Sequence, residues 1–239
     1  MPAARSRAVP TGTPSPRSSS ASAPDPLRVL LVRHGQSTWN ADGRWQGQAD
    51  PPLSALGEHQ ASAAAEAVRH LGVTRVLASD LERARRTAEL ATPEGVRCEV
   101  DAAFRERHAG EWTGLRRAEI EAQYPGYLDD HRRPPAYEGD ESLLARALPA
   151  LAALARLADP AGLADPAGLP DGAVLVVTHG GVIGAIERRL GAPWVPVPNL
   201  GGRWLHVSPD TSPDEGFVLG ARELLIDPDA VALTVPGQI

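Results

Sequence analysis

The sequence predicts an α/β fold with a mostly parallel central sheet. Short apolar runs of strand length alternate with longer stretches of helical pattern, and glycines and prolines separate many of them. Two of the apolar runs end abruptly in polar segments, which is typical of buried strands that open into functional loops. The 239 residues, 42% of them hydrophobic, are enough for one domain with a sizeable core. One domain of this class is therefore the simplest expectation.

The amino-terminal part contains the first predicted strand. Residues 1–26 are rich in Pro, Ser and Thr and lack the continuous apolar segment of a secretory signal, so we expect a disordered tail. Residues 27–32 (LRVLLV) form an apolar run that predicts a buried strand. The polar residues 33–40 follow directly. We therefore expect the first functional loop at the carboxyl end of that strand.

The next segments follow a β-α-β-α rhythm. Ser54 begins a stretch of helical pattern that stops at Gly72. Residues 75–79 (RVLAS) predict a second strand, and residues 81–91 predict the helix that follows it. Alternation of this kind is typical of a parallel sheet with helices packed on it.

The middle of the chain is mostly helical in pattern. Residues 115–157 carry that pattern, with a break at residues 132–139 that predicts a loop or lid. The sequence DPAGL then occurs twice within residues 159–169. Its proline and glycine content predicts a duplicated surface linker rather than regular structure.

The second half contains the clearest buried strand. Residues 173–177 (AVLVV) predict it, and Thr178-His179-Gly180-Gly181 follows before a helix over residues 182–190. Residues 204–207 predict an edge strand, and residues 209–239 form an extension that we expect to pack on the domain. In open parallel sheets the ligand crevice lies at the carboxyl ends of the strands, so both polar loops are expected to face one pocket.

Composition and charge exclude several classes of protein. The formal net charge of −6 gives no overall attraction to nucleic acid or to an anionic membrane, and no run reaches the about 18 apolar residues that span a bilayer. Cys98 is the single cysteine, which excludes an internal disulfide and a cysteine-built zinc site and favours the cytoplasm. Every fixed cation is an arginine. An anionic ligand would therefore need a local pocket of arginines.

Four short segments carry the residues suited to chemistry. Arg33-His34-Gly35 places a cation and an imidazole beside a glycine, and Asn40 adds a hydrogen-bond donor nearby. Arg83 lies where the second strand enters a helix, whose amino end favours negative charge. Glu106 is the best candidate for a general acid, and His179 is a second histidine followed by glycines. This set predicts a site for a phosphate group.

Together these segments closely resemble the histidine phosphatase superfamily, also called the phosphoglycerate mutase-like family. The resemblance covers most of residues 27–207, and the motifs occur in the family's order. It implies a three-layer α/β/α fold of phosphoglycerate mutase-like type, with the domain at residues 27–208. It also implies a cytoplasmic enzyme that acts on small phosphorylated metabolites without metal or cofactor, with nucleic acid and membrane excluded as partners and a homodimer left open.

The resemblance further implies a role for each motif residue. His34 would be the nucleophile that carries the phosphoryl group, and Glu106 would protonate the leaving oxygen. The phosphoryl oxygens would be held by Arg33, Arg83 and His179. Contacts to substrate are expected from Gly35, Asn40, Gln46, Gly47 and Gly180.

Hydrolysis and mutase activity remain alternatives within the family. Residues 106–108 and 132–133 resemble mutase segments that bind a phosphoglycerate carboxylate, although two adjacent arginines are more often a solvated surface. Residues 43–50 resemble the phosphatase branch, and Ala109 stands where mutases usually carry a tyrosine. We therefore favour hydrolysis.

Two further interpretations concern substrate and activity. Residues 46–50, 53–57 and 200–204 are similar to actinobacterial members of the family that dephosphorylate glucosyl-3-phosphoglycerate. That compound or a related phosphosugar is the expected substrate. A phosphate-binding protein without catalysis is the alternative of a different class, and the complete set of motif residues argues against it.

Overall fold

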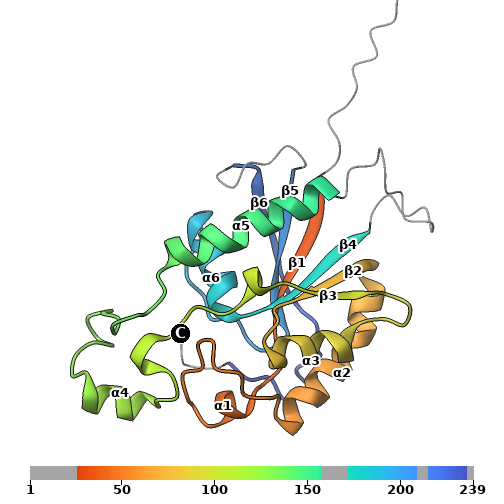
Figure 1. The fold of residues 1–239 in the computed structure, drawn as a ribbon. Helices are drawn as coiled ribbons and strands as arrows, with labels where there is room; N and C mark the ends of the chain where they lie inside the picture. The colour runs from red at the N-terminus through yellow and green to blue at the C-terminus, as the bar shows by residue number, and fades with distance from the viewer. Residues whose placement is uncertain (1–25, 158–171, 209–214, 236–239) are drawn as a thin grey trace, which may run out of the picture.

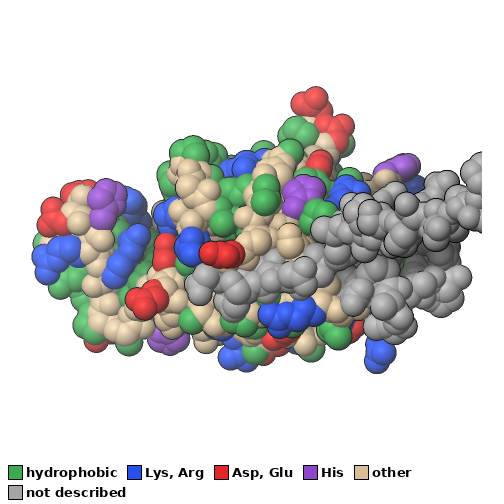
Figure 2. Space-filling model, turned by 90° about the horizontal axis from the view of Figure 1, so that it is seen from above, with side chains coloured by type: hydrophobic (Ala, Val, Ile, Leu, Met, Phe, Trp, Pro, Cys, Tyr) green, Lys and Arg blue, Asp and Glu red, His purple; other side chains and the backbone are tan. Residues whose placement is uncertain are grey.

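The structure is a computed structural model, and it describes residues 26–157, 172–208 and 215–235. The expected tail at residues 1–26 and the DPAGL repeat lie outside the described residues, apart from Pro26. Within the described ranges, no helix is both long and apolar enough to cross a membrane. Figure 2 views the molecule from the amino ends of the parallel strands, where acidic and basic side chains are interspersed among the visible residues.

The core of the fold is one six-stranded sheet with the order β3-β2-β4-β1-β5-β6. Its strands are β1 (Leu27–Arg33), β2 (Val73–Ala78), β3 (Cys98–Val100), β4 (Ala173–Thr178), β5 (Gly201–Val207) and β6 (Phe217–Leu224). The first four strands are mutually parallel, and β5 pairs antiparallel with both β1 and β6. The sheet is therefore mostly parallel, as predicted.

Helices cover both faces of the sheet (Figure 1). One face carries α2 (Ala55–His70) and α3 (Glu82–Ala91), and the other carries α5 (Asp140–Leu157) and α6 (Gly180–Arg189). Successive side chains of β1 alternate between these two layers, with Leu30 packed toward α2 and α3 and Leu31 toward α5 and α6. Because both faces are covered, β1 and β4 read as continuous apolar runs. The expected three-layer α/β/α fold is confirmed.

Local chemistry defines the ends of α2. The side chain of Ser54 accepts a hydrogen bond from the Gly57 N–H and caps the amino end of the helix. Gly72 follows the carboxyl end with φ at +66°, a conformation that glycine adopts at no steric cost. The predicted helix is confirmed at both ends.

A small lobe extends from the sheet beyond the carboxyl ends of the parallel strands (Figure 1). It contains α1 (Thr38–Ala41), α4 (Arg117–Gln123) and the 3-10 turn η2 (Gly110–Trp112), whereas the 3-10 turn η1 (Ala102–Phe104) packs on α5 in the main core. A second core around the buried Trp45, Trp112 and Ile120 stabilises it. The predicted break at residues 132–139 lies between α4 and α5, beside this lobe.

The prediction of an edge strand at residues 204–207 is wrong. These residues belong to β5, which pairs with β1 on one side and β6 on the other. The edge is β6, in the segment that the sequence leaves weakly patterned. Its polar Arg222 breaks the apolar pattern because the side chain binds Glu187 of α6.

Candidate active site

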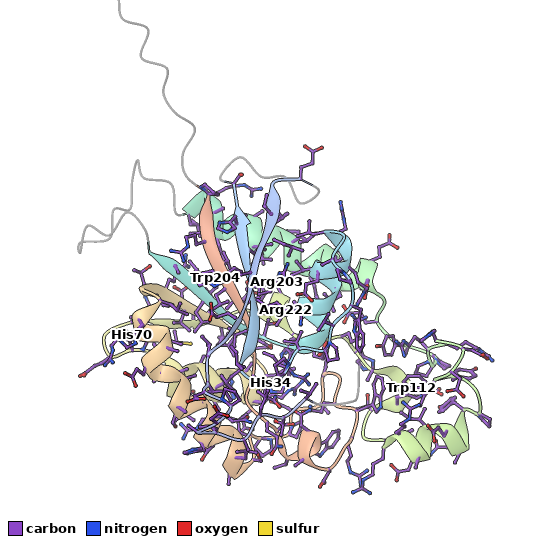
Figure 3. The ribbon with its side chains drawn as sticks, turned by 180° about the vertical axis from the view of Figure 1, so that it is seen from behind. His34, His70, Trp112, Arg203, Trp204 and Arg222 are labelled. Carbon is purple, nitrogen blue, oxygen red and sulfur yellow. The ribbon has the colours of Figure 1, made fainter. Side chains whose placement is uncertain are left out.

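Two histidines meet where the central strands end. His34 and His179 directly follow β1 and β4, which are parallel neighbours in the sheet. The His34 N–H donates to the Thr178 carbonyl at 3.0 Å, and the two imidazole ring centres lie 5.1 Å apart. Figure 3 shows His34 at this end of the sheet, far from His70 on the outer helix. The parallel pairing of β1 and β4 thus places both histidines at one site.

The hydrogen bonds of His34 determine which ring nitrogen carries the proton. Nδ1 lies 2.6 Å from the Gly35 carbonyl oxygen, which can only accept, so Nδ1 donates. Nε2 accepts from the Arg83 Nε–H at 3.2 Å, so its lone pair lies on the side of the cavity-lining Arg83. Burial, with the charges of Arg83 and Arg33, holds the pKa of His34 well below its usual value. His34 is therefore a neutral imidazole whose unprotonated nitrogen is Nε2.

Two buried arginines flank this imidazole. Arg83 donates to the carbonyls of Ala49 at 2.7 Å and Gly47 at 2.9 Å, and Arg33 donates to the Val197 carbonyl at 2.8 Å. Arg33 Nε is buried with no hydrogen-bond partner among the described residues. Burial lowers the pKa of each guanidinium to about 10, so both stay charged at neutral pH. They give the site two fixed positive charges.

His179 is held by its Nε2 atom, which lies 2.9 Å from Ser79 Oγ. Its Nδ1 atom is buried and has no partner among the described residues. Burial is the main cause that lowers the pKa of His179 well below its usual value, and the charge of Arg83 adds to it. An anion at the site would oppose both effects and favour the protonated ring.

Glu106 is fixed by backbone donors. Its carboxylate accepts from the Arg107 N–H at 2.7 Å and from the Gly181 N–H at 3.0 Å. Gly181 lies in the first turn of α6, and a Cβ atom there would overlap the Glu106 carboxylate, with Cδ only 2.9 Å away. Only glycine therefore fits beside Glu106 without displacing it.

Of these groups, Arg33, His34, Arg83 and Glu106 line one cavity. Its lining consists of Arg33, His34, Asn40, Trp45, Gln46, Gly47, Arg83, Glu106, Arg107, Ala109, Tyr137 and Gly181. Asn40 Nδ2 is buried and has no partner within the part of the chain that the structure describes. Gln46 Oε1 accepts from Ser37 Oγ at 2.7 Å and so fixes its own loop. Among the described residues there is no cluster of three or more histidine, cysteine or acidic side chains that could hold a metal ion.

Known proteins match this chain over most of its length. Residues 29–202, well over half of the chain, match the histidine phosphatase superfamily (branch 1). The chain belongs to this superfamily. A glucosyl-3-phosphoglycerate phosphatase of Mycobacterium tuberculosis H37Rv is 37% identical over 201 residues, which cover 80% of this histidine phosphatase and 89% of the relative. Its place among such phosphatases makes the chain a phosphoric monoester hydrolase.

Solved structures agree with this assignment. The mycobacterial glucosyl-3-phosphoglycerate phosphatase in complex with VO3 has a TM-score of 0.68 and 31% identity, and the match covers 84% of this chain and all of that one. A mycobacterial hydrolase reaches a TM-score of 0.70 at 32% identity, with 82% and 97% of the two chains covered. A probable phosphoglycerate mutase of Serratia proteamaculans is 52% identical, but only over 86 residues, or 35% of this chain.

Only some of the site residues expected from the sequence line the cavity of this histidine phosphatase. Those that line the cavity are Arg33, His34, Asn40, Gln46, Gly47, Arg83 and Glu106. His179 lies against His34 without lining the cavity, and Gly180 begins α6. Gly35 packs against α2, where a Cβ atom would lie 2.6 Å from the Gly57 carbonyl oxygen. Its observed role is thus to let the histidine loop approach this helix.

Arg107 and Tyr137 also line the cavity. The sequence indicated Arg107 only as part of residues 106–108, which resemble a carboxylate-binding segment of mutases, and it did not indicate Tyr137. Arg107 has a signal in its position next to Glu106, but Tyr137 lies in the irregular break before α5 and has none. The guanidinium of Arg107 lies 5.6 Å from the centre of the Tyr137 ring. Arg132 and Arg133 are exposed, stack on aromatic rings and do not line the cavity.

Proposed function

We propose that this histidine phosphatase hydrolyses small phosphomonoesters through a covalent intermediate on His34. The observation that carries the proposal is a group of three buried polar atoms near that ring with no partner among the described residues: the donors Arg33 Nε and Asn40 Nδ2, and His179 Nδ1, which becomes a donor when the ring is protonated. Buried donors are normally satisfied, and a tetrahedral oxyanion supplies several acceptors at once. A phosphoryl group fits both this chemistry and the neutral imidazole beside it.

The first step transfers the phosphoryl group to the protein. The Nε2 lone pair of His34 attacks phosphorus as the bond to the leaving oxygen breaks, and Glu106, protonated at this point, gives that oxygen a proton. Charge spreads over the three equatorial oxygens, where Arg33 and Arg83 stabilise it. The Nδ1–H bond to the Gly35 carbonyl supports the positive charge that develops on the imidazole.

The second step returns the site to its starting state. Glu106, now ionised, takes a proton from water as the water oxygen attacks phosphorus. The bond between His34 Nε2 and phosphorus breaks, and inorganic phosphate leaves. Splitting one difficult displacement into two in this way is the advantage of a covalent intermediate.

The proposed substrate is glucosyl-3-phosphoglycerate or a related phosphosugar. Similarity to a phosphatase named for that substrate extends over 80% of the chain, whereas similarity to the probable mutase extends over 35%. The cavity wall beyond the arginines is formed by Trp45 and Tyr137 with polar neighbours. Aromatic faces beside hydrogen-bonding groups suit a ligand that has apolar and hydroxyl-bearing surfaces.

The test is phosphate release, without added metal, from a panel that contains glucosyl-3-phosphoglycerate, 3-phosphoglycerate, phosphosugars and nucleotides. His34→Ala is compared with His59→Ala, which removes an exposed histidine of α2. We expect release to be lost in the first variant only. Intact-mass analysis of rapidly quenched wild-type protein should detect one added phosphoryl group that is absent from His34→Ala.

The other outcomes identify the alternatives. Isomerised phosphoglycerate without net release would make the protein a mutase. Binding of phosphate without turnover of any substrate would make it a phosphate-binding protein. Release that persists in His34→Ala would refute the covalent mechanism.

A further inference from the structure

The segment that carries Glu106 is held in place by Arg146, a residue of α5. Arg146 donates to the carbonyls of Ala103 and Arg105 at 2.7 Å each and to the carbonyl of Glu106 at 3.1 Å. Apart from the short turn η1, this segment has no regular secondary structure before η2. Its course therefore depends on contacts from outside, and Arg146 supplies three of them.

Arg146 is itself fixed by Glu138, which lies in the break before α5. The two side chains form a pair in which Nε donates to Oε1 and a terminal nitrogen donates to Oε2, both at 3.0 Å. This pair is largely shielded, because the side chains are 24% and 12% exposed. Burial alone would raise the pKa of Glu138, but the hydrogen bonds from Arg146 and the His108 N–H lower it below its usual value. Glu138 therefore stays ionised and keeps its hold on the arginine.

Glu138 also binds both residues that follow Glu106. Its carboxylate accepts from the His108 N–H at 3.0 Å, and its own carbonyl accepts from the Arg107 guanidinium at 2.9 Å. Its neighbour Tyr137 forms part of the cavity wall. Contacts from one carboxylate and one guanidinium thus hold the backbone on both sides of Glu106.

We infer that Arg146 and Glu138 form a clamp that positions Glu106 for proton transfer to the leaving group. The inference rests on the proposed function, in which Glu106 is the general acid. Neither clamp residue lines the cavity, so both are positioning residues that act through the backbone of Glu106. Misplacing a reacting group by about 1 Å can lower a rate about a hundredfold.

The clamp has a consequence that a general stabilising role does not have. An alkyl phosphate needs a proton on its leaving oxygen, whereas p-nitrophenolate departs without one. The value of kcat/KM reports the steps up to the first bond cleavage, before Glu106 acts as a base. Weakening the clamp should therefore lower kcat/KM for glycerol 3-phosphate and leave kcat/KM for p-nitrophenyl phosphate nearly unchanged.

The experiment compares Arg146→Met, Arg146→Lys and Glu106→Gln with both substrates. We expect Arg146→Met to lose at least about tenfold more activity on the alkyl ester, and Glu106→Gln to show the same selectivity more strongly. Arg146→Lys should restore part of the loss, because lysine keeps the charge but cannot form the two-point contact with Glu138. The matched control is Arg75→Met, which breaks a similar arginine–glutamate pair with Glu99 away from the site. It should affect the two substrates equally.

Each other result has a distinct meaning. If Glu106→Gln is selective and Arg146→Met lowers both substrates equally, or neither, the clamp has no positioning role. If Glu106→Gln is not selective, Glu106 is not the general acid, so that part of the proposed function fails and the inference fails with it, whereas the role of His34 is tested separately by His34→Ala. Should Arg146→Met not fold, Glu138→Gln tests the same ratio, and an unselective loss there would overturn the inference.

Discussion

Substitution of Gly181 by alanine should remove activity without unfolding the protein. The added Cβ atom would lie 2.9 Å from Cδ of Glu106 and 3.0 Å from Nε of Arg107, and closer still to a carboxylate oxygen. Carbon atoms in ordinary contact are about 3.5–4.0 Å apart, so the carboxyl group must move by about 1 Å. The displaced atoms are the ends of flexible side chains, so the backbone need not shift.

The size of the effect follows from that displacement. A reacting group misplaced by about 1 Å costs about a hundredfold in rate, which corresponds to about 2.7 kcal/mol of transition-state stabilisation. We therefore expect kcat/KM for an alkyl phosphate to fall about a hundredfold, with a midpoint of thermal unfolding close to that of the parent protein. The comparison needs steady-state kinetics and calorimetry on the same preparations.

Gly139→Ala is the matched control for this substitution. A Cβ atom at Gly139 would meet no other atom within 4 Å, so this variant should behave like the parent protein. Activity of Gly181→Ala within about threefold of the parent would refute the reasoning, because the carboxyl position would then not matter for catalysis. Equal loss in both glycine variants would refute it as well.

Three further outcomes follow from the site and its support. The free energy of unfolding should fall as the pH drops below about 6.5, because His34 and His179 are buried and neutral in the folded protein whereas their counterparts in the unfolded chain take up protons. His179→Gln should make this dependence less steep by up to about 1.4 kcal/mol per pH unit, as measured by urea titrations at several pH values. Asn40→Ala should weaken vanadate binding about tenfold in calorimetric titrations, since one donor to the anion is lost; unchanged affinity would contradict the assignment of its free amide. Glu187→Ala should lower the free energy of unfolding by about 3–5 kcal/mol, because it leaves the partly buried guanidinium of Arg222 without its carboxylate partner. An unchanged denaturation midpoint would show that the ion pair contributes little to stability.

The parts of the fold that could be predicted are those whose signals are local. β1 and β4 are buried on both faces, so their residues form unbroken apolar runs. The ends of α2 follow from Ser54 and Gly72 alone. β6 could not be predicted, because Arg222 breaks its pattern and is satisfied by Glu187, 35 residues away in the chain. Such a contact exists only in the folded molecule.

The residues of the candidate site also divide into those with a local sequence signal and those placed only by the folded structure. His34 and His179 directly follow predicted strands, so the rule that ligands bind at the carboxyl ends of parallel strands brings them together. Tyr137 reaches the cavity from an irregular segment whose path no periodicity encodes. The same holds for Arg146, whose three backbone contacts depend on how residues 103–106 run across α5. Sequence motifs therefore indicated the cavity-lining His34, Arg83 and Glu106 better than the residues that support them.

In the proposed mechanism, the contact between Arg83 and His34 would make recognition and reactivity one event. A lone pair that already accepts a hydrogen bond is a poor attacking group, and in the resting molecule the Arg83 Nε–H occupies the Nε2 lone pair. An incoming phosphoryl oxygen is the natural competitor for that N–H, because it carries negative charge. His34 Nε2 would then be released only when an anionic ligand arrives. On the proposed mechanism, the buried guanidinium would keep the imidazole unreactive toward other electrophiles between turnovers.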